Sequence, residues 1–196
     1  HDTTVTYTNT QYGRIQIIKT TNTGENLSGW QFEIVNKTTG KVVQTVTTDA
    51  SGYATTDKLA PGSYIVREVG GGNAYWQLDT SGHTVTVVAG QTTTVTVNNV
   101  HRGRIVVQKN AVNGSPEGWR FEIWQGNTLV ETLTTGADGR AVSKYLLPGN
   151  YKVKELHDRD GTYWEYDVKV EQNATVTAGH DTTVTYTNTH HGLLQI

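Results

Sequence analysis

The strongest constraint on this chain is an internal repeat. GRIQIIK, GWQFEI and PGSY occur in that order in the first half, and GRIVVQK, GWRFEI and PGNY follow in the same order in the second half. Gly13 and Gly103, which open the two copies, lie 90 positions apart in a chain of 196 residues. A period of this length predicts two complete modules, each one structural unit.

The two ends of the chain carry parts of the same repeat. HDTTVTYTNT stands at positions 1–10 and returns unchanged at 180–189, where it closes the second module. We therefore predict four segments: 1–12 as the last strand of a preceding repeat, 13–101 as the first module, 102–191 as the second, and 192–196 as the start of a following repeat. The natural protein is expected to be a longer array.

Composition and periodicity predict an all-β fold. Thr, Val, Gly, Tyr and Trp are plentiful, while two Phe and no Met leave little for a helical core. Short runs that alternate apolar and polar residues are separated by turn clusters such as DASG and LPG, which indicates about seven strands per module. No segment has a helical period, so each module should be a small sandwich whose first and last strands can pair.

Charge and hydropathy argue against several classes of partner. The formal net charge is -2, with Lys and Arg dispersed along the chain, so neither a nucleic acid nor a direct membrane contact is expected. No apolar run approaches the roughly 20 residues of a membrane span, and any export signal or anchor is expected outside residues 1–196. Cysteine is absent, so stability must come from a source other than disulfides.

Each module also places three polar side chains in the register of its apolar face. Successive side chains of a strand point to opposite faces, so every second residue shares one face. In the first module the inward sets are Ile15, Ile17 and Lys19; Tyr64, Val66 and Glu68; and Val95, Val97 and Asn99. In the second they are Ile105, Val107 and Lys109; Tyr151, Val153 and Glu155; and Val184, Tyr186 and Asn188. The sequence therefore predicts a Lys, a Glu and an Asn facing each core.

A buried Lys beside a buried Glu suits a covalent reaction with an amide. Burial disfavours charge, so it lowers the pKa of the Lys and raises the pKa of the carboxyl. A neutral amine is a nucleophile, and a carboxyl held against the Asn amide can polarise its carbonyl and shuttle protons. Proximity in a dry core would allow one reaction that forms an isopeptide bond and releases ammonia. The alternative is that each Lys reaches solvent from its strand end and forms an ordinary ion pair.

These motifs resemble the B-type repeat of Gram-positive collagen adhesins, the Cna B-type domain, over both modules. The resemblance rests on an opening strand that ends in Lys, a Phe after a small-residue turn, a Pro-Gly-x-Tyr segment before the Glu, and a closing Asn. The matching residues are Lys19 and Lys109, Phe32 and Phe121, Glu68 and Glu155, and Asn99 and Asn188.

The resemblance implies two tandem prealbumin-like or Ig-like Greek-key β-sandwiches. It also implies that the Lys of the first strand bonds to the Asn of the last strand, with the Glu as the catalytic residue. The implied cross-links are Lys19 to Asn99, promoted by Glu68, and Lys109 to Asn188, promoted by Glu155. Asn98 adjoins Asn99, but Asn99 aligns with Asn188 and shares the face of Val97.

The function that follows is a stalk or spacer of a bacterial surface adhesin or pilus-like protein. The chain would not be an enzyme, because its only chemistry would be self-directed and single-turnover. Its partners would be neighbouring repeats of the same chain, while a host matrix protein or glycan would be bound through other domains. The location implied is extracellular and attached to the cell wall. We expect no cofactor and no metal.

A ligand-binding adhesin module, for a matrix protein or a carbohydrate, is the main rival function, and an accessory β-domain of an enzyme is the third. Trp124 lies in outward register without a counterpart in the first module, so it indicates a ligand patch or a contact between modules. Trp76 and Trp164 are expected to pack. His190 and His191 lack a third ligand for a metal, and Asn9 should stay unreacted.

Overall fold

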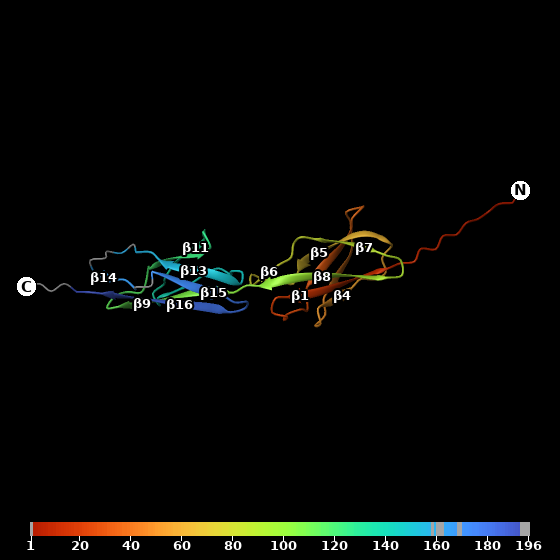
Figure 1. The fold of residues 1–196 in the computed structure, drawn as a ribbon. Helices are drawn as coiled ribbons and strands as arrows, with labels where there is room; N and C mark the ends of the chain where they lie inside the picture. The colour runs from red at the N-terminus through yellow and green to blue at the C-terminus, as the bar shows by residue number, and fades with distance from the viewer. Residues whose placement is uncertain (1, 158, 160–162, 168–169, 193–196) are drawn as a thin grey trace, which may run out of the picture. The chain divides into compact units, whose positions relative to one another are not determined.

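The computed structural model describes residues 2–157, 159, 163–167 and 170–192. Contacts divide the chain into two compact units, His1–Val100 and His101–Ile196, and each is built from strands (Figure 1). The first unit contains β1 (Arg14–Thr21), β2 (Gln31–Asn36), β3 (Val42–Thr47), β4 (Tyr53–Thr55), β5 (Gly62–Gly70), β6 (Trp76–Gln77), β7 (His83–Val87) and β8 (Thr92–His101). The second contains β9 (Arg104–Val112), β10 (Arg120–Gln125), β11 (Thr128–Thr134), β12 (Arg140–Val142), β13 (Gly149–Glu155), β14 (Trp164–Glu165), β15 (Glu171–Val176) and β16 (Asp181–His190).

Two four-stranded sheets form each unit. Their strand orders are β4-β1-β8-β6 and β3-β2-β5-β7 in the first unit, and β12-β9-β16-β14 and β11-β10-β13-β15 in the second. Corresponding strands hold the same places in both units, so the sequence repeat is also a repeat of structure. The described residues contain no helix. The prediction of two all-β sandwiches in tandem is confirmed.

The first and last strands of each unit pair in parallel at the centre of one sheet. In the first unit β1 pairs with β8 so that Lys19 lies opposite Val97 and Thr21 opposite Asn99. In the second unit β9 and β16 repeat this pairing. Because the strands run in the same direction, the chain enters at one end of the sheet and leaves at the other.

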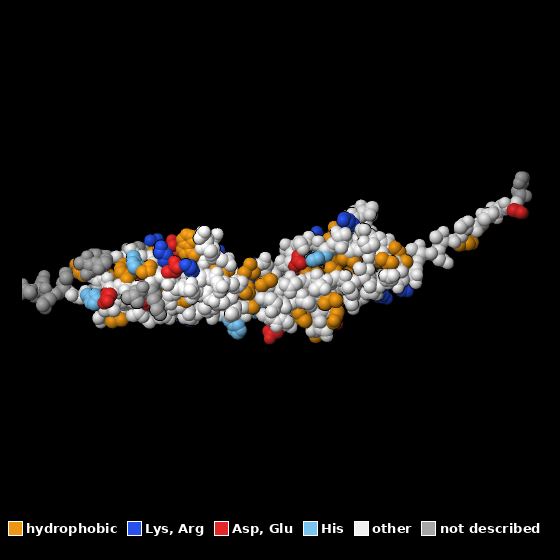
Figure 2. Space-filling model, viewed as in Figure 1, with side chains coloured by type: hydrophobic (Ala, Val, Ile, Leu, Met, Phe, Trp, Pro, Cys, Tyr) orange, Lys and Arg blue, Asp and Glu red, His pale blue; other side chains and the backbone are white. Residues whose placement is uncertain are grey.

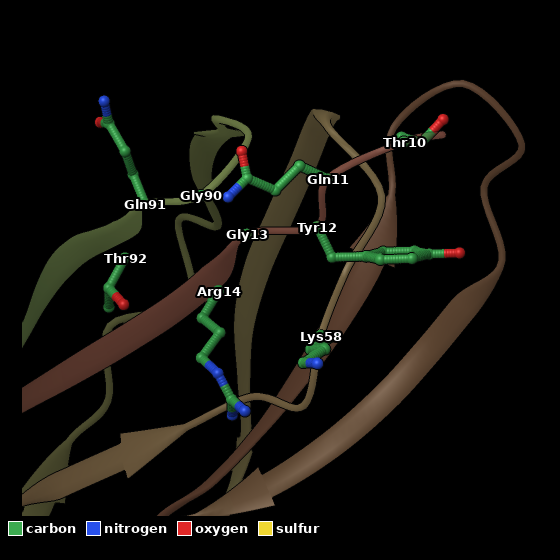
Figure 3. A pocket seen from close by; sticks show the side chains of 9 residues that line it. All are labelled: Thr10, Gln11, Tyr12, Gly13, Arg14, Lys58, Gly90, Gln91 and Thr92. Carbon is green, nitrogen blue, oxygen red and sulfur yellow. The ribbon is translucent and has the colours of Figure 1, made fainter. Parts of the chain in front are cut away.

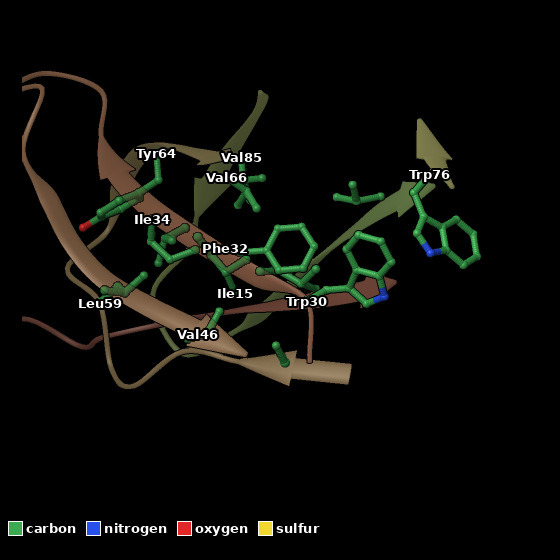
Figure 4. Close-up of a cluster of buried hydrophobic side chains, with 14 residues drawn as sticks. Ile15, Trp30, Phe32, Ile34, Val46, Leu59, Tyr64, Val66, Trp76 and Val85 are labelled. Carbon is green, nitrogen blue, oxygen red and sulfur yellow. The ribbon is translucent and has the colours of Figure 1, made fainter. Parts of the chain in front are cut away.

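Alternating burial along the strands builds each core. Ile15, Ile17 and Phe32 have no exposed surface, and the burial along β1 alternates as the period of two predicts. Figure 4 shows the buried side chains of the first unit, with Trp30 and Trp76 at one end of the cluster. The same arrangement recurs in the second unit around Phe121.

A tyrosine closes the turn that begins the Glu-bearing strand. The hydroxyl of Tyr64 donates to the carbonyl oxygen of Ala60 at 2.9 Å, and the hydroxyl of Tyr151 donates to Leu147 at the same distance. This bond fixes the first inward residue after the Pro-Gly turn. Four residues further on, in the same register, the strand presents its Glu to the core.

The strand count differs from the predicted seven, because each unit has eight strands among its described residues. The additional ones are β6 and β14, which contain two residues each. A two-residue strand is too short to show an alternating pattern, so periodicity could not indicate it. Both begin with the Trp of a Tyr-Trp pair, and both lead towards the candidate site.

The N-terminal copy of HDTTVTYTNT forms no strand over residues 2–12. Val5 is 65% and Tyr7 87% exposed, whereas the identical sequence at 180–189 provides most of β16. The two copies differ because the copy in β16 pairs with the neighbouring strand β9, and a strand without such pairing is not stable in water. The four predicted segments and their boundaries stay predictions, and most of segment 192–196 lies outside the described residues.

Charged side chains of both signs lie intermixed on the face seen in Figure 2. Within the described part of the chain, no helix has the length and hydropathy to cross a membrane. The expected lack of a nucleic-acid partner rests on charge and stays a prediction.

Candidate functional site

The three predicted residues of each module come from two sheets and meet in the core. Lys19 lies near the end of β1 and Asn99 near the end of β8, so the parallel register makes them diagonal neighbours on one face. Glu68 comes from β5 in the facing sheet, where it is paired with Phe32 of β2. In the second module Lys109, Glu155 and Asn188 occupy the corresponding places on β9, β13 and β16.

In the first module these side chains are buried and in contact. Lys19 is 1%, Glu68 7% and Asn99 0% exposed. The Lys19 Nζ lies 3.7 Å from Glu68 Oε1 and donates to the carbonyl oxygen of Val97 at 3.3 Å. Asn99 Nδ2 donates to the same Glu68 Oε1 at 2.8 Å. One carboxylate oxygen therefore lies between the amine and the amide nitrogen.

The second module repeats two of these contacts, with a shorter Lys-Glu distance and a longer Asn-Glu distance. Lys109 Nζ lies 2.7 Å from Glu155 Oε1, and Asn188 Nδ2 donates to this oxygen at 3.1 Å. None of the three residues is more than 1% exposed. The residue opposite Lys109 is Tyr186 rather than a Val, and its hydroxyl donates to the carbonyl oxygen of Val153 inside the core. Burial raises the pKa of Tyr186, so this hydroxyl stays a neutral donor.

Burial also sets the charge states of the cluster. It lowers the pKa of Lys19 to about 8 and outweighs the attraction of Glu68. The pKa of Glu68 is raised by burial, against the opposing effects of the Asn99 hydrogen bond and of Lys19. Burial likewise lowers the pKa of Lys109. In the first module the shifts bring the Lys19 amine and the Glu68 carboxyl towards a state in which a proton passes readily between them.

An indole ring covers each amine. The Lys19 Nζ lies 4.7 Å from the ring centroid of Trp30, and Lys109 Nζ lies 4.2 Å from that of Trp119. Trp76 packs edge-on against Trp30, with ring centroids 5.6 Å apart, at the end of the core shown in Figure 4. The GW motif marked Trp30 and Trp119 as repeated residues, but strand register did not indicate that their rings would exclude water from the amines.

A backbone amide completes the contacts of each Asn. The N–H of Asp79 donates to Asn99 Oδ1 at 2.9 Å, and that of Asp167 donates to Asn188 Oδ1 at 2.7 Å. Sequence reasoning missed both donors, because a peptide N–H has no residue-type signature. The repeated Trp-x-x-Asp pattern, which starts at Trp76 and Trp164, was the available signal.

The structure separates Asn99 from its neighbour Asn98. Asn98 is exposed and accepts a hydrogen bond from the Thr20 hydroxyl on the outer face of the sheet, 3.1 Å away. Asn9 is exposed on the segment without strand structure. The Asn that meets the carboxyl is therefore the one that strand register selects.

The remaining predicted features lie outside the two clusters. Trp164 packs edge-on against Trp119, and His191 Nε2 lies 3.0 Å from Glu165 Oε2. Trp124 is half-buried on the outer face of its sheet, and its indole N–H donates to Glu122 Oε2 at 2.9 Å.

A surface hollow of about 460 Å³ lies at the opposite end of β1 from Lys19. Arg14, Lys58 and Tyr12 are among the residues that line it (Figure 3). Arg14 Nη1 donates to the carbonyl oxygen of Thr56, whereas its counterpart Arg104 is paired with Asp181. No residue of the Lys-Glu-Asn clusters lines the hollow, so it is separate from the candidate site.

Comparison with known proteins identifies the family. The model of the SpaA prealbumin-like fold domain matches residues 13–101 and again 103–190. No curated protein matches the chain.

Three solved structures illustrate the likeness. The Bacillus anthracis TIE protein is 24% identical (TM-score 0.49), with 92% of this chain and 34% of that chain covered. A streptococcal ancillary pilin is 22% identical (TM-score 0.46), with 92% and 63% covered. The shaft pilin spaA of Lactobacillus rhamnosus GG is 14% identical (TM-score 0.42), with 94% and 100% covered. The chain thus spans less than two thirds of the first two proteins. On the strength of the family match, the chain belongs to the SpaA prealbumin-like fold domain family and contains two such domains in tandem.

Proposed function

We propose that this chain is a load-bearing spacer of a bacterial cell-surface protein and that each module is locked by an isopeptide bond that it forms itself. The observation that carries the proposal is the buried Lys-Glu-Asn cluster between the first and last strands, present twice with the same contacts. A buried ion pair is weak evidence for stability alone, and the Asn beside it gives the amine an electrophile.

Each side chain has a definite role in the proposed bond. The neutral amine of Lys19 attacks Cγ of Asn99. Glu68 Oε1, which contacts both nitrogens, takes a proton from the amine and delivers it to the amide nitrogen, which leaves as ammonia. The carboxyl contacts the leaving nitrogen rather than the carbonyl oxygen, so it acts as a proton shuttle. Lys109, Glu155 and Asn188 would react in the same way.

The position of the bond suits a module under tension. Force enters at the start of β1 and leaves at the end of β8, so it loads the parallel pair in shear. A bond from Lys19 to Asn99 joins the strands near their common end and carries the load past the 80 positions between them. The remainder of the module would then bear no tension.

The proposed setting follows from this role. The chain would lie outside the cell on a wall-attached protein, with neighbouring repeats of the same chain as its partners. It would turn over no substrate and need no cofactor.

Single-molecule stretching of the chain from its two ends tests the proposal. The unsubstituted chain should show no lengthening from inside either module. Glu68→Gln should release the positions between Lys19 and Asn99, which at roughly 3.4 Å per residue adds about 270 Å of contour length. Glu155→Gln should release a similar length from the second module. Lengthening of the unsubstituted chain by these amounts would contradict the proposal.

A ligand-binding module is the second candidate function, and Trp124 favours it. The ring borders a hollow of about 330 Å³ that Lys152, Lys154 and Glu171 also line, a mixture of aromatic and polar groups that suits a carbohydrate. A screen against glycans and matrix proteins tests this candidate. Saturable binding that Trp124→Ala abolishes would support it, and binding that persists in this variant would refute the role of the ring.

A further inference from the structure

The orientation of each Asn side-chain amide is fixed by a peptide N–H, which can donate a hydrogen bond but cannot accept one. A peptide N–H only donates, so the group that faces Asp79 N must be the carbonyl oxygen of Asn99, and the amide nitrogen must face Glu68. The same holds for Asn188 between Asp167 N and Glu155. Each amide thus directs its oxygen to a backbone N–H and its nitrogen to a carboxyl.

Isopeptide formation would place negative charge on this oxygen. When Lys19 Nζ bonds to Cγ of Asn99, the π electrons of the carbonyl move to Oδ1. A proton from Nζ passes through the Glu68 carboxyl to Nδ2, the Cγ–Nδ2 bond breaks, the carbonyl re-forms, and ammonia leaves. Asn99 is 0% exposed, so water cannot stabilise the transient oxyanion.

We propose that the peptide N–H groups of Asp79 and Asp167 are the oxyanion donors of the two cross-linking reactions; this inference rests on the isopeptide chemistry proposed above. Each N–H is already at hydrogen-bond distance from the oxygen that gains charge, and in the first module the same N–H also donates to Glu68 Oε2 at 3.2 Å. Neither N–H has to move to reach that oxygen as the charge develops. The donor therefore stabilises the transition state more than the reactants.

The two modules hold this N–H in place by different contacts. In the first, the Asp79 carboxylate accepts hydrogen bonds from the Ser81 N–H and hydroxyl and lies 2.9 Å from His83 Nε2. In the second, Asp167 Oδ2 accepts from the N–H of Thr187, the residue before Asn188. Different anchors that give the same N–H placement indicate that the N–H itself is the shared functional group, with each carboxylate as its positioning group.

The test replaces one peptide N–H by an ester oxygen. The full chain is assembled by chemical ligation in denaturant with the α-hydroxy acid analogue of aspartic acid at position 79, so both Asn side chains are intact until refolding starts the reaction. Mass spectrometry of proteolytic fragments follows ammonia loss from each module separately. A chain that retains Asp79 and is assembled identically provides the reference rate.

The expected result is a rate in the first module reduced about 100- to 1000-fold, the loss seen when one oxyanion donor is removed, with an unchanged rate in the second. An unchanged rate in the first module would overturn the inference. Absence of ammonia loss from both modules of the reference chain would instead overturn the isopeptide proposal itself.

Two further variants separate catalysis from folding. The reciprocal ester at position 167 should slow only the second module, so the inference can be judged there if the first ester variant fails to fold. Asp79→Asn keeps the peptide N–H and changes only its anchor, and its rate should stay within about tenfold of the reference. A loss in Asp79→Asn as large as in the ester would assign the effect to the carboxylate and overturn the inference.

Discussion

Removing the buried reactive pair of the first module should lower its stability by a predictable amount. The perturbation is the double variant Lys19→Met with Glu68→Gln, which removes the amine that would form the bond and the carboxyl that would promote it while it keeps the side-chain volumes similar. The bond from Lys19 to Asn99 would close a loop of 80 positions. Treated like a disulfide in the chain-entropy model, the bond contributes about 4.5 kcal/mol at 25 °C.

The assay is unfolding of the full chain in guanidinium chloride, followed by tryptophan fluorescence. With a slope of roughly 3 kcal/mol per molar for a module of this size, the midpoint of the first module should fall by about 1.5 M. The second module, unchanged in this variant, serves as an internal reference. The mass deficit of the variant, relative to its own sequence mass, should be one ammonia smaller than that of the unsubstituted chain. If the deficit changes in this way but the stability falls by less than about 1 kcal/mol, the reasoning is refuted.

An ion pair on the outer face of the sheet that carries Glu68 provides the control. Arg67 and Glu33 form an ion pair with side chains 53% and 27% exposed, in adjacent strands β5 and β2. Arg67→Met with Glu33→Gln makes the corresponding change, a basic side chain to Met and a Glu to Gln, without touching the cluster. Because exposed ion pairs contribute about 0 to 1 kcal/mol, this control should leave the midpoint nearly unchanged.

The remaining predictions concern the amine, its cover and the choice of Asn. In the unlinked variant Asn99→Ala, the free energy of unfolding should rise between pH 8 and pH 10.5. The pKa of Lys19 is about 8 in the folded state and 10.5 for the free side chain, so the unfolded state binds more protons over this range. A free energy of unfolding from urea denaturation that does not change with pH would contradict this. Trp30→Leu should admit water, raise the pKa of Lys19 and slow ammonia loss at neutral pH on refolding; an unchanged rate would exclude a role for the ring. Asn98→Ala should leave the intact mass deficit in place and Asn99→Ala should reduce it by one ammonia; the reverse pattern would assign the bond to Asn98.

Strand register predicted the parts of the molecule that depend on alternation. Lys19, Glu68 and Asn99 each lie on the same face of their strand as apolar residues two positions away. In a β-sandwich the apolar face of a strand is buried in the core, as it is here. The repeat then required the same arrangement in the second module. The pairing of first and last strands was also expected, but its parallel direction was not predicted.

Other parts of the site depend on loops and rings, where alternation carries no information. The two-residue strand β6 and the loop to Asp79 bring a backbone N–H to Asn99, and no side-chain pattern encodes a backbone group. The cover of Lys19 by Trp30 depends on a ring that belongs to the residue just before β2 of the facing sheet. Only the recurrence of Trp-x-x-Asp and GW in both modules could have indicated these contacts.

The most direct test of the central proposal is the intact mass of the purified full chain under denaturing conditions. The unsubstituted chain should be lighter than its sequence mass by two ammonia molecules. Glu68→Gln and Glu155→Gln should each restore one, and the double variant should restore both. A full sequence mass for the unsubstituted chain would contradict the proposed cross-links and leave the buried clusters as ordinary ion pairs.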